Sequence, residues 1–294
     1  MKKLNFIFII LFLMFLGSGC SKATPTEIPT QVPVQNTIEP TATTAPLALQ
    51  VNGEGILQSE YDAQIARLQM ALSETGTEMT PEQQKERIIS NLIDEVLLSQ
   101  AATAAGFSIS DAELSQRIDT LISGIGGQEK FNEWLSTYSY TEESFRNELR
   151  RSLLAAWQRD QIIESVPQTA DQVHAYQLLY QDIDNAVAAL NQIKAGTDFS
   201  TLAKAQDPTL GGDLGWFPQG TLTQPEVEAV AFALEPGEIS DVIQSGIGYH
   251  IIKVVERDAE HPLSTEARRK LQELKLDEWL KTSRDASTIE IFVP

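Results

Sequence analysis

The sequence predicts an α+β protein with two folded parts: a mainly helical domain and a smaller domain in which helices surround a four-stranded, mainly antiparallel sheet. Three observations lead to this prediction. Residues 47–168 carry repeated helix-start signals and wide apolar stripes. Residues 169–258 alternate short strand-like runs with short helical patterns. Residues 259–294 add one amphipathic helix and one final alternating segment.

Residues 1–19 are typical of an export signal. Two lysines precede the apolar run Leu4–Leu16, which is too short to span a hydrocarbon core of ~30 Å. Small residues then lead to Cys20, the only cysteine in the chain. This segment resembles the lipobox of bacterial lipoproteins, although Gly17 stands where that motif usually has leucine. The resemblance implies lipid attachment at Cys20; the alternative is an ordinary cleaved signal with an incidental cysteine.

The amino-acid composition predicts a tether and argues against nucleic-acid binding and disulfide bonds. Residues 20–46 are rich in Thr, Pro, Gln and Ala, so we expect a disordered tether that cannot bury enough surface to fold. The net charge is −19 and no dense basic patch occurs, so nucleic acid is not an expected partner. A single cysteine allows no disulfide within the chain, so packing alone must stabilise the fold.

The helical part opens with a predicted hairpin over Leu47–Leu57, because Asn52-Gly53 between apolar residues favours a tight turn. Ser59 is then expected to open a helix that Gly76 ends. Three later helices are expected to start at the capping residues Thr80, Ser110 and Thr141.

Four segments of this part, VNGEGI, NLIDEVLLSQAA, GGQEKFNEWL and TEESFRNELRRSL, occur in this order. Together they resemble the N-terminal chaperone domain of periplasmic or surface foldases of the SurA and PrsA type. The resemblance implies that residues 259–294 return to the helical domain of residues 47–168. We therefore expect the final strand, Thr288–Val293, to pair near Leu47–Val51.

The second domain, residues 169–258, is predicted to have the element order β-α-α-β-α-β-β. The expected elements are Val173–Tyr180, Ile183–Ala195, Phe199–Ala205, Leu214–Phe217, Glu226–Leu234, Ile239–Ile243 and His250–Val255. Within them, the runs GGDLGWFPQG, AFALEPGEIS and SGIGYHIIKV follow one another. This order closely resembles the parvulin (PpiC, rotamase) family of peptidyl-prolyl cis-trans isomerases.

The resemblance implies isomerisation of Xaa-Pro bonds without a cofactor or metal. The barrier to rotation is ~18–20 kcal/mol, because resonance gives the C–N bond double-bond character. A site that removes the amide from water and fits its twisted form lowers this barrier without a nucleophile. The expected site is therefore an apolar cradle with a few polar groups.

The resemblance assigns four polar residues to the catalytic site. His250 matches the family's second core histidine, Ser245 a small hydroxyl residue near the amide, and Asp207 the acid near the twisting bond. Asp207 also suits a turn cap, since it precedes a proline. Gln177 stands where the family has its first-strand histidine, and we expect Gln177 to hydrogen-bond His250.

The apolar cradle is assigned to Leu222, Val227, Phe232 and Phe217. Val227 replaces an aromatic residue of the family, which predicts a shallower cradle and reduced activity. His174 lies three residues before Gln177 on the same strand, so it faces the other side of the sheet and cannot replace the missing histidine. His174 and His261 are expected to be exposed.

These features favour a lipid-anchored extracytoplasmic foldase. Its expected partners are unfolded or partly folded exported proteins with Xaa-Pro bonds, and the membrane through the lipid anchor. Two alternatives remain open: a holdase chaperone whose parvulin domain has lost most turnover, and a structural assembly factor of the envelope.

Overall fold

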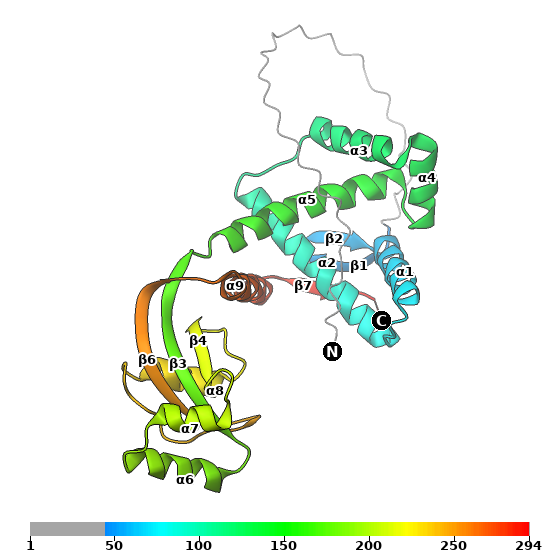
Figure 1. The fold of residues 1–294 in the computed structure, drawn as a ribbon. Coiled ribbons are helices and arrows are strands. Elements are labelled where there is room, and N and C mark those ends of the chain that lie inside the picture. Colours follow the sequence, from blue (N-terminus) through cyan, green and yellow to red (C-terminus); the bar gives the residue numbers. More distant parts are fainter. Residues whose placement is uncertain (1–44, 294) are drawn as a thin grey trace, which may run out of the picture. The chain divides into compact units, whose positions relative to one another are not determined.

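A computed structural model describes residues 45–293 (Figure 1). Within that range the chain forms nine helices and seven strands, and the strands form one sheet of three strands and one of four. The predicted export signal, Cys20 and nearly all of the predicted tether lie outside the described residues. None of the helices in the described range has the length and apolar character needed to cross a membrane.

A β-hairpin opens the described chain, with β1 (Leu47–Val51) paired antiparallel to β2 (Glu54–Leu57). The turn residues Asn52 and Gly53 have φ angles of 52° and 87°. Positive φ at both central positions is typical of the type I′ turn, which Asn-Gly sequences favour. The predicted hairpin and its turn are confirmed.

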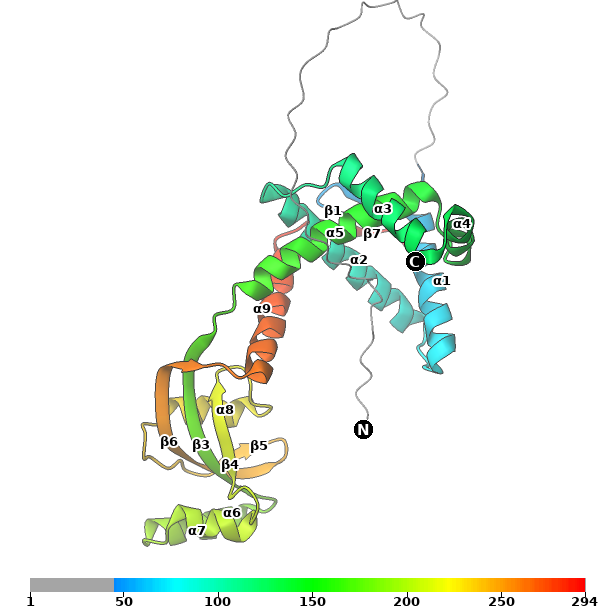
Figure 2. The ribbon, with the colours of Figure 1, turned by 45° about the horizontal axis from the view of Figure 1, so that its top comes forward.

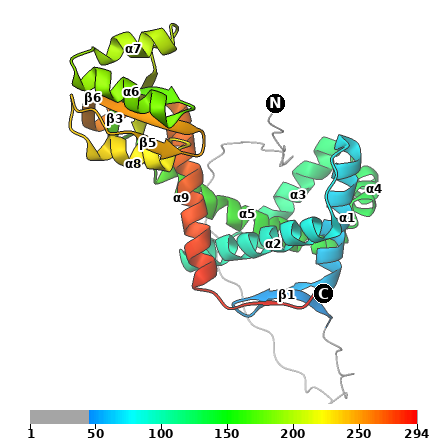
Figure 3. The ribbon, with the colours of Figure 1, turned by 90° about the horizontal axis from the view of Figure 1, so that it is seen from below.

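The last strand, β7 (Ile289–Ile291), pairs antiparallel with β1 and gives the order β2-β1-β7. Figure 3 shows the C-terminal segment running beside β1. The Asn52 side chain fixes the same junction, since its Nδ2 donates to Gln100 Oε1 at 3.0 Å and to Ser287 Oγ at 3.1 Å. The pairing expected for the final strand is therefore present.

Five helices follow the hairpin: α1 (Gln58–Thr75), α2 (Pro81–Ala104), α3 (Asp111–Ile125), α4 (Gln128–Thr137) and α5 (Glu142–Glu164). The predicted capping residues Thr80, Ser110 and Thr141 each accept a hydrogen bond from the backbone N–H three residues later. These reciprocal caps satisfy helix N–H groups that have no partner within the helix, and they confirm the three predicted starts.

The start of α1 differs from the prediction. The helix begins at Gln58, one residue before Ser59, and no side chain caps it. Instead, the backbone N–H of Gln58 donates to the carbonyl oxygen of Pro46 at 2.8 Å. The chain enters α1 directly from β2, and the residue just before β1 supplies the acceptor.

A cluster around Leu114, Phe131 and Phe145 joins α3, α4 and α5, and two further hydrophobic clusters hold the helical part together. One lies between the first sheet, α1 and α2, and its buried members are Ala48, Leu49, Val51, Ile56, Leu68, Leu72, Ile88, Ile89, Leu92, Ile93, Val96, Leu97 and Val293. The other joins α9 (Thr265–Asp285) to α5 (Figure 2) through Leu276, Trp279 and Leu280, which pack against Leu98, Ala155 and Ile162. The C-terminal helix thus contributes to the core of the helical part.

Charged side chains also cross the interface between α1, α2 and α5. Arg67 of α1 pairs with Glu148 of α5 at 3.0 Å. Arg151 of α5 pairs with Glu60 of α1 and, at 3.6 Å, with Glu95 of α2. The Arg151 side chain is only 10 % exposed, so these pairs, which we call the interhelix ion network, are largely removed from water.

The second domain contains β3 (Thr169–Tyr180), α6 (Ile183–Lys194), α7 (Phe199–Gln206), β4 (Asp213–Pro218), α8 (Pro225–Ala233), β5 (Ile243–Ser245) and β6 (Gly248–Pro262). The strands form an antiparallel sheet of order β4-β3-β6-β5. The predicted β-α-α-β-α-β-β order and the α+β class are confirmed.

The segment Ile239–Ile243 departs from the prediction of a continuous strand. Only Ile243 continues into β5, while Ile239 forms an isolated bridge to Lys253. Between them, the Ser240 hydroxyl accepts a hydrogen bond from the backbone N–H of Ile252 at 2.9 Å. A side chain replaces a backbone carbonyl there, so the regular ladder is interrupted.

Helices cover the two faces of the four-stranded sheet differently (Figure 3). One face packs against α8, where Val173, Ala175, Phe217, Val227, Ala231, Phe232, Ile252 and Val254 are buried; we call it the α8 face. The other packs against α6 and α7, where Leu178, Ala189, Leu190, Phe199, Ala203 and Ile251 are buried; we call it the α6–α7 face.

Candidate active site

His250 lies on β6, between β3 and β5, and only 1 % of it is exposed. Its strand neighbours two and four residues on, Ile252 and Val254, belong to the cluster on the α8 face. Because side chains alternate along a strand, His250 lies on that same face. The imidazole therefore borders an apolar cluster and has lost its contact with water.

Both ring nitrogens of His250 have hydrogen-bond partners. Nδ1 lies 3.1 Å from Gln177 Oε1, and Nε2 lies 2.7 Å from Ser245 Oγ. An amide oxygen only accepts, so Nδ1 carries the ring proton and Nε2 accepts from the Ser245 hydroxyl. The backbone N–H of Ile247 donates to Ser245 Oγ at 3.2 Å and completes what we call the His250 chain. The predicted bond between Gln177 and His250 is present.

Burial lowers the pKa of His250 below its ordinary value of 6.5, while the Glu226 carboxylate opposes this shift. Desolvation disfavours the charged imidazolium, so the neutral ring dominates at pH 7. A neutral histidine with one fixed tautomer matches the pattern of donors and acceptors around it. The His250 chain is thus a fixed, uncharged array.

The four predicted cradle residues gather on the α8 face beside this array. Phe217, Val227 and Phe232 are buried, and the two aromatic rings meet edge to face with centroids 6.0 Å apart. Leu222 is only half-buried. Leu222 is therefore the predicted cradle residue that a ligand reaches directly, whereas the other three form the floor beneath it.

Leu214 is half-buried in the same cluster and was missed by the sequence analysis. The register along β3 and β4 passes from Gly215 to Asp213, which leaves Leu214 without a cross-strand partner. Such a β-bulge redirects the side chain of the extra residue. The signal available in the sequence was Gly215, whose φ of 68° the bulge requires.

Asp207 ends α7 and makes no hydrogen bond to the other predicted catalytic residues within the described chain. Its carboxylate accepts from the backbone N–H groups of Thr209 at 3.1 Å, Leu210 at 3.0 Å and Gly212 at 3.3 Å. The bond from Leu210 is the main reason that the pKa of Asp207 lies below its ordinary value. Asp207 therefore shapes its own loop.

That loop reaches the His250 chain through its last residue. The backbone N–H of Gln177 donates to the carbonyl oxygen of Gly212 at 2.8 Å. A Cβ atom on Gly212 would lie 2.0 Å from the Gln177 carbonyl oxygen, and Gly212 has a φ of 73°. Only glycine permits this approach, so Asp207 and Gly212 together position Gln177.

The expectation that His174 and His261 are exposed is wrong. The His174 side chain is 19 % exposed, and its Nε2 lies 2.8 Å from Asp213 Oδ1. The His261 side chain is 28 % exposed, and its ring stacks on Trp216 with centroids 4.0 Å apart. Asp213 and Trp216, which lie on another strand and far away in sequence, partly cover these two rings.

Comparison with known proteins gives the family. Residues 2–159 match the SurA-like N-terminal domain, and residues 167–256 match the PPIC-type PPIASE (rotamase) domain. The chain belongs to the SurA-like family and carries a PPIC-type domain. The resemblances to SurA, PrsA and parvulins stated from the sequence are confirmed.

Two curated relatives and one solved structure show how similar known proteins are to this chain. The foldase protein PrsA of Oceanobacillus iheyensis is 33 % identical over 190 residues, which cover 58 % of this chain and 63 % of the relative. The chaperone SurA of Nitrosospira multiformis is 26 % identical over 255 residues, covering 73 % and 57 %. The crystal structure of PrsA from Bacillus anthracis matches 70 % of this chain and 99 % of its own, with 24 % identity and a TM-score of 0.42. The chain thus spans less than two thirds of the length of these curated relatives.

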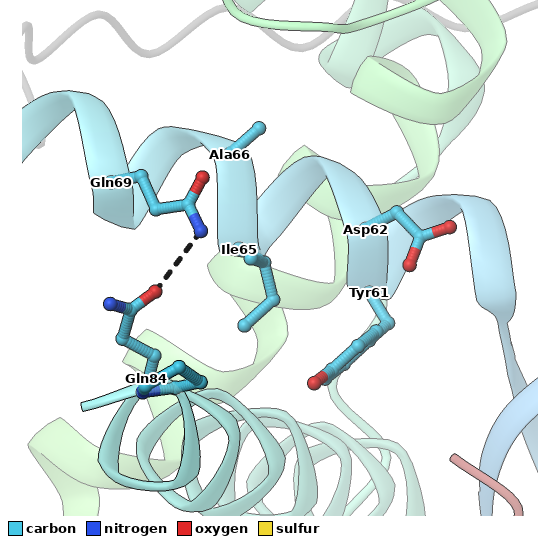
Figure 4. Close-up of a pocket in the computed structure, with 7 residues that line it drawn as sticks. Tyr61, Asp62, Ile65, Ala66, Gln69 and Gln84 are labelled. Carbon is cyan, nitrogen blue, oxygen red and sulfur yellow. Dashed lines mark hydrogen bonds between the residues drawn. The ribbon is translucent and has the colours of Figure 1, made fainter. Parts of the chain in front are cut away.

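The SurA-like domain has a hollow between α1 and the start of α2 (Figure 4). Its lining residues are Tyr61, Asp62, Ile65, Ala66, Gln69, Pro81 and Gln84. Gln69 Nε2 donates to Gln84 Oε1 at 3.2 Å at one end of it. A second hollow shares these two glutamines and continues past Leu72 and Met79. Together they offer apolar side chains next to amide donors and acceptors.

Proposed function

We propose that the PPIC-type domain catalyses cis–trans isomerisation of Xaa-Pro bonds in polypeptides. The observation that carries the proposal is the buried, neutral His250 chain at the border of the apolar cluster on the α8 face. The half-buried side chains of Leu222 and Leu214 provide an apolar wall for a pyrrolidine ring. The reacting amide then lies beside polar groups that carry no net charge.

The chemistry follows from that environment. Rotation is slow because amide resonance separates charge and water stabilises the planar form. An apolar wall removes water from the amide, and groups that fit the twisted form better than either planar form lower the barrier. Since no covalent bond forms, Ser245 acts through its oriented hydroxyl rather than as a nucleophile. Gln177 and His250 hold that hydroxyl in place.

Gln177 and Val227 are the two departures from the family pattern. The Gln177 amide accepts the Nδ1 proton of His250, so a second imidazole is not needed to complete the chain. Val227 is buried in the cluster, where it supplies less apolar surface to the cradle than the aromatic residue of the family would. We therefore expect retained but reduced isomerase activity.

The test measures isomerisation of a short Xaa-Pro peptide by NMR exchange, for the native chain and for His250→Ala. We expect catalysis by the native chain and a loss of about tenfold or more in the variant, with an unchanged fold by circular dichroism. No acceleration by the native chain over the uncatalysed rate would refute the isomerase proposal.

We propose holdase chaperone activity as a second function, supported by the hollows between α1 and α2. Ala66→Arg would fill the hollow of Figure 4 without removing a core side chain. We expect this variant to suppress aggregation of an unfolded client less well, and His250→Ala to suppress it as well as the native chain. Equal suppression by all three proteins would contradict this assignment of the holding surface.

We further propose an extracytoplasmic setting, with Cys20 as the lipid attachment site. The basic start, short apolar run and single cysteine of the sequence support it. A diacylglyceryl group supplies the two chains that stable anchoring requires. Labelling with radioactive palmitate should mark the native chain but not Cys20→Ser. Equal labelling of both would place the lipid elsewhere.

A further inference from the structure

The α6–α7 face of the sheet continues beyond its helices into a group of aromatic rings. His174 and Tyr176 lie on β3, Trp216 on β4 and His261 on β6; we call these four the aromatic platform. Trp216 stacks on His261 at 4.0 Å, and His174 lies 5.7 Å from Trp216 and 5.3 Å from Tyr176, measured between centroids. The rings are therefore contiguous across three strands.

This platform lies on the opposite side of the sheet from the His250 chain. His174 and Tyr176 alternate with Val173, Ala175 and Gln177, which face α8 or His250. Tyr176 instead packs with the cluster of the α6–α7 face. A ligand on the platform would thus leave the proposed isomerase site free.

The platform is open enough to bind a ligand. Part of each ring reaches solvent, with side-chain exposures of 19 % for His174 and 28 % for His261. Within residues 45–293 the indole N–H of Trp216 donates no hydrogen bond, and it is not a buried group. A Trp N–H next to stacked rings can donate to a peptide carbonyl while the rings contact the side chains.

Acidic groups surround the rings. Asp213 bonds His174, Glu256 is the cross-strand neighbour of His174, and Asp258 lies 3.4 Å from His261. Lys253 is the cross-strand neighbour of Tyr176, whereas Arg257, paired with Val173, lies over the Phe232 ring on the α8 face. Three carboxylates against one ammonium favour a ligand that carries positive charge.

From these observations we propose that the aromatic platform binds extended proline-rich polypeptide segments that contain lysine or arginine. Pyrrolidine rings in polyproline II geometry dock into grooves between aromatic rings, and this conformation is already ordered before binding. Basic residues beside the prolines would meet Asp213, Glu256 and Asp258. Such a surface would bind a client segment independently of the isomerase site, whether or not that site catalyses isomerisation.

The test uses the full chain and a proline-rich peptide with two lysines. A second peptide has glutamate at the same two positions. Binding is followed by calorimetry and by the indole N–H resonances. We expect the lysine peptide to bind, to shift the Trp216 resonance and to bind more weakly as salt is raised. No binding of the lysine peptide, or equal binding of both peptides, would overturn the proposal.

Variants locate the binding surface. We expect Trp216→Leu and His261→Ala each to weaken binding of the lysine peptide about tenfold, because each removes one stacked ring. Tyr249→Leu, which removes a ring of the same sheet outside the platform, and His250→Ala should bind as the native chain does. Unchanged binding in His261→Ala, the smaller change, would overturn the proposal even if Trp216→Leu folded poorly. Loss of binding in His250→Ala would place the peptide at the isomerase site instead.

Discussion

The two folded parts of the chain bury polar side chains in opposite ways. In the SurA-like domain the interhelix ion network pairs opposite charges across three helices. In the PPIC-type domain the His250 chain links neutral donors and acceptors. Removing one member of the first leaves an unpaired buried charge, whereas protonation disrupts the second. We therefore expect loss of one charged side chain to destabilise the SurA-like domain, and protonation of the His250 chain to destabilise the PPIC-type domain.

The largest expected effect comes from Arg151→Met. Arg151 is the common partner of Glu60 and Glu95, and its side chain is 10 % exposed, so its loss leaves two carboxylates without their cation. Breaking such a pair from one side costs about 3–5 kcal/mol of folding free energy. Urea unfolding measures this loss.

Arg150→Met is the matched control, since Arg150 is the next residue on α5 and pairs with Asp111, whose side chain is 88 % exposed. Exposed pairs contribute at most about 1 kcal/mol. Equal destabilisation by the two variants would remove the distinction between a buried network and surface pairs.

A second large effect is expected from a substitution at Gly212. This residue positions Gln177 in the His250 chain and has no part in the interhelix ion network. Gly212→Ala forces Cβ against the Gln177 carbonyl and adds strain at a φ of 73°. We expect a loss of about 1–3 kcal/mol, together with reduced isomerisation because Gln177 moves.

Gly196→Ala separates strain from contact, because Gly196 has a φ of 105° and a Cβ atom added there would meet no neighbour within 4 Å. It should lose stability but keep the isomerase rate per folded molecule. If Gly196→Ala lowered that rate as much as Gly212→Ala, the close contact with Gln177 would not be what positions the site.

The sequence predicted best what depends on neighbouring residues. The capping boxes at Thr80, Ser110 and Thr141 each need only four consecutive residues, and all three are present. The hydrogen bond from His250 to Gln177 was also expected, because the family resemblance places both residues at the positions of the two core histidines. Local pattern therefore indicated the fold class, whereas the polar half of the proposed site followed from the family resemblance.

What escaped prediction depends on contacts between strands. The bulge at Leu214 arises from the register between β3 and β4, and no local pattern marks it except a glycine. The environment of His261 depends on Trp216, which lies on another strand. Burial of Val227 and Phe232 beneath Leu222 likewise depends on how α8 packs. The sequence named the apolar residues but not which of them remain accessible.

The third prediction concerns pH. The folded-state pKa of His250 lies below the unfolded value of 6.5, so the folded protein binds fewer protons between these values. The contribution of His250 to the free energy of unfolding is fully present above pH 6.5. It decreases as the pH falls below 6.5, by up to ~1.4 kcal/mol per pH unit. Urea unfolding between about pH 7 and pH 5 should show this decrease, and His250→Gln should reduce it.

Glu95 provides the contrast, because burial raises its pKa above 4.5 even though Arg151 opposes the shift. Glu95 therefore binds a proton more tightly in the folded protein than in the unfolded chain. Its protonation at low pH removes the energetic cost of burying the charged carboxylate. Glu95→Gln should remove this gain in stability at low pH. The free energy of unfolding of the variant should therefore decrease more steeply toward low pH than that of the native chain. An unchanged pH profile in both His250→Gln and Glu95→Gln would show that neither group accounts for the response of its domain.

The smallest effect is expected from Gln177→Glu, which introduces a charged partner into the neutral chain. A carboxylate 3.1 Å from His250 Nδ1 would favour the imidazolium and raise its pKa. The titration of the His250 ring proton, followed by NMR, measures the shift. Gln244→Glu adds the same charge at an exposed position on β5 and should leave that titration nearly unchanged, because water screens it. Equal shifts in both variants would mean that net charge controls His250; a shift in Gln177→Glu alone would mean that one hydrogen bond decides whether this site behaves as a neutral chain or as an ion pair.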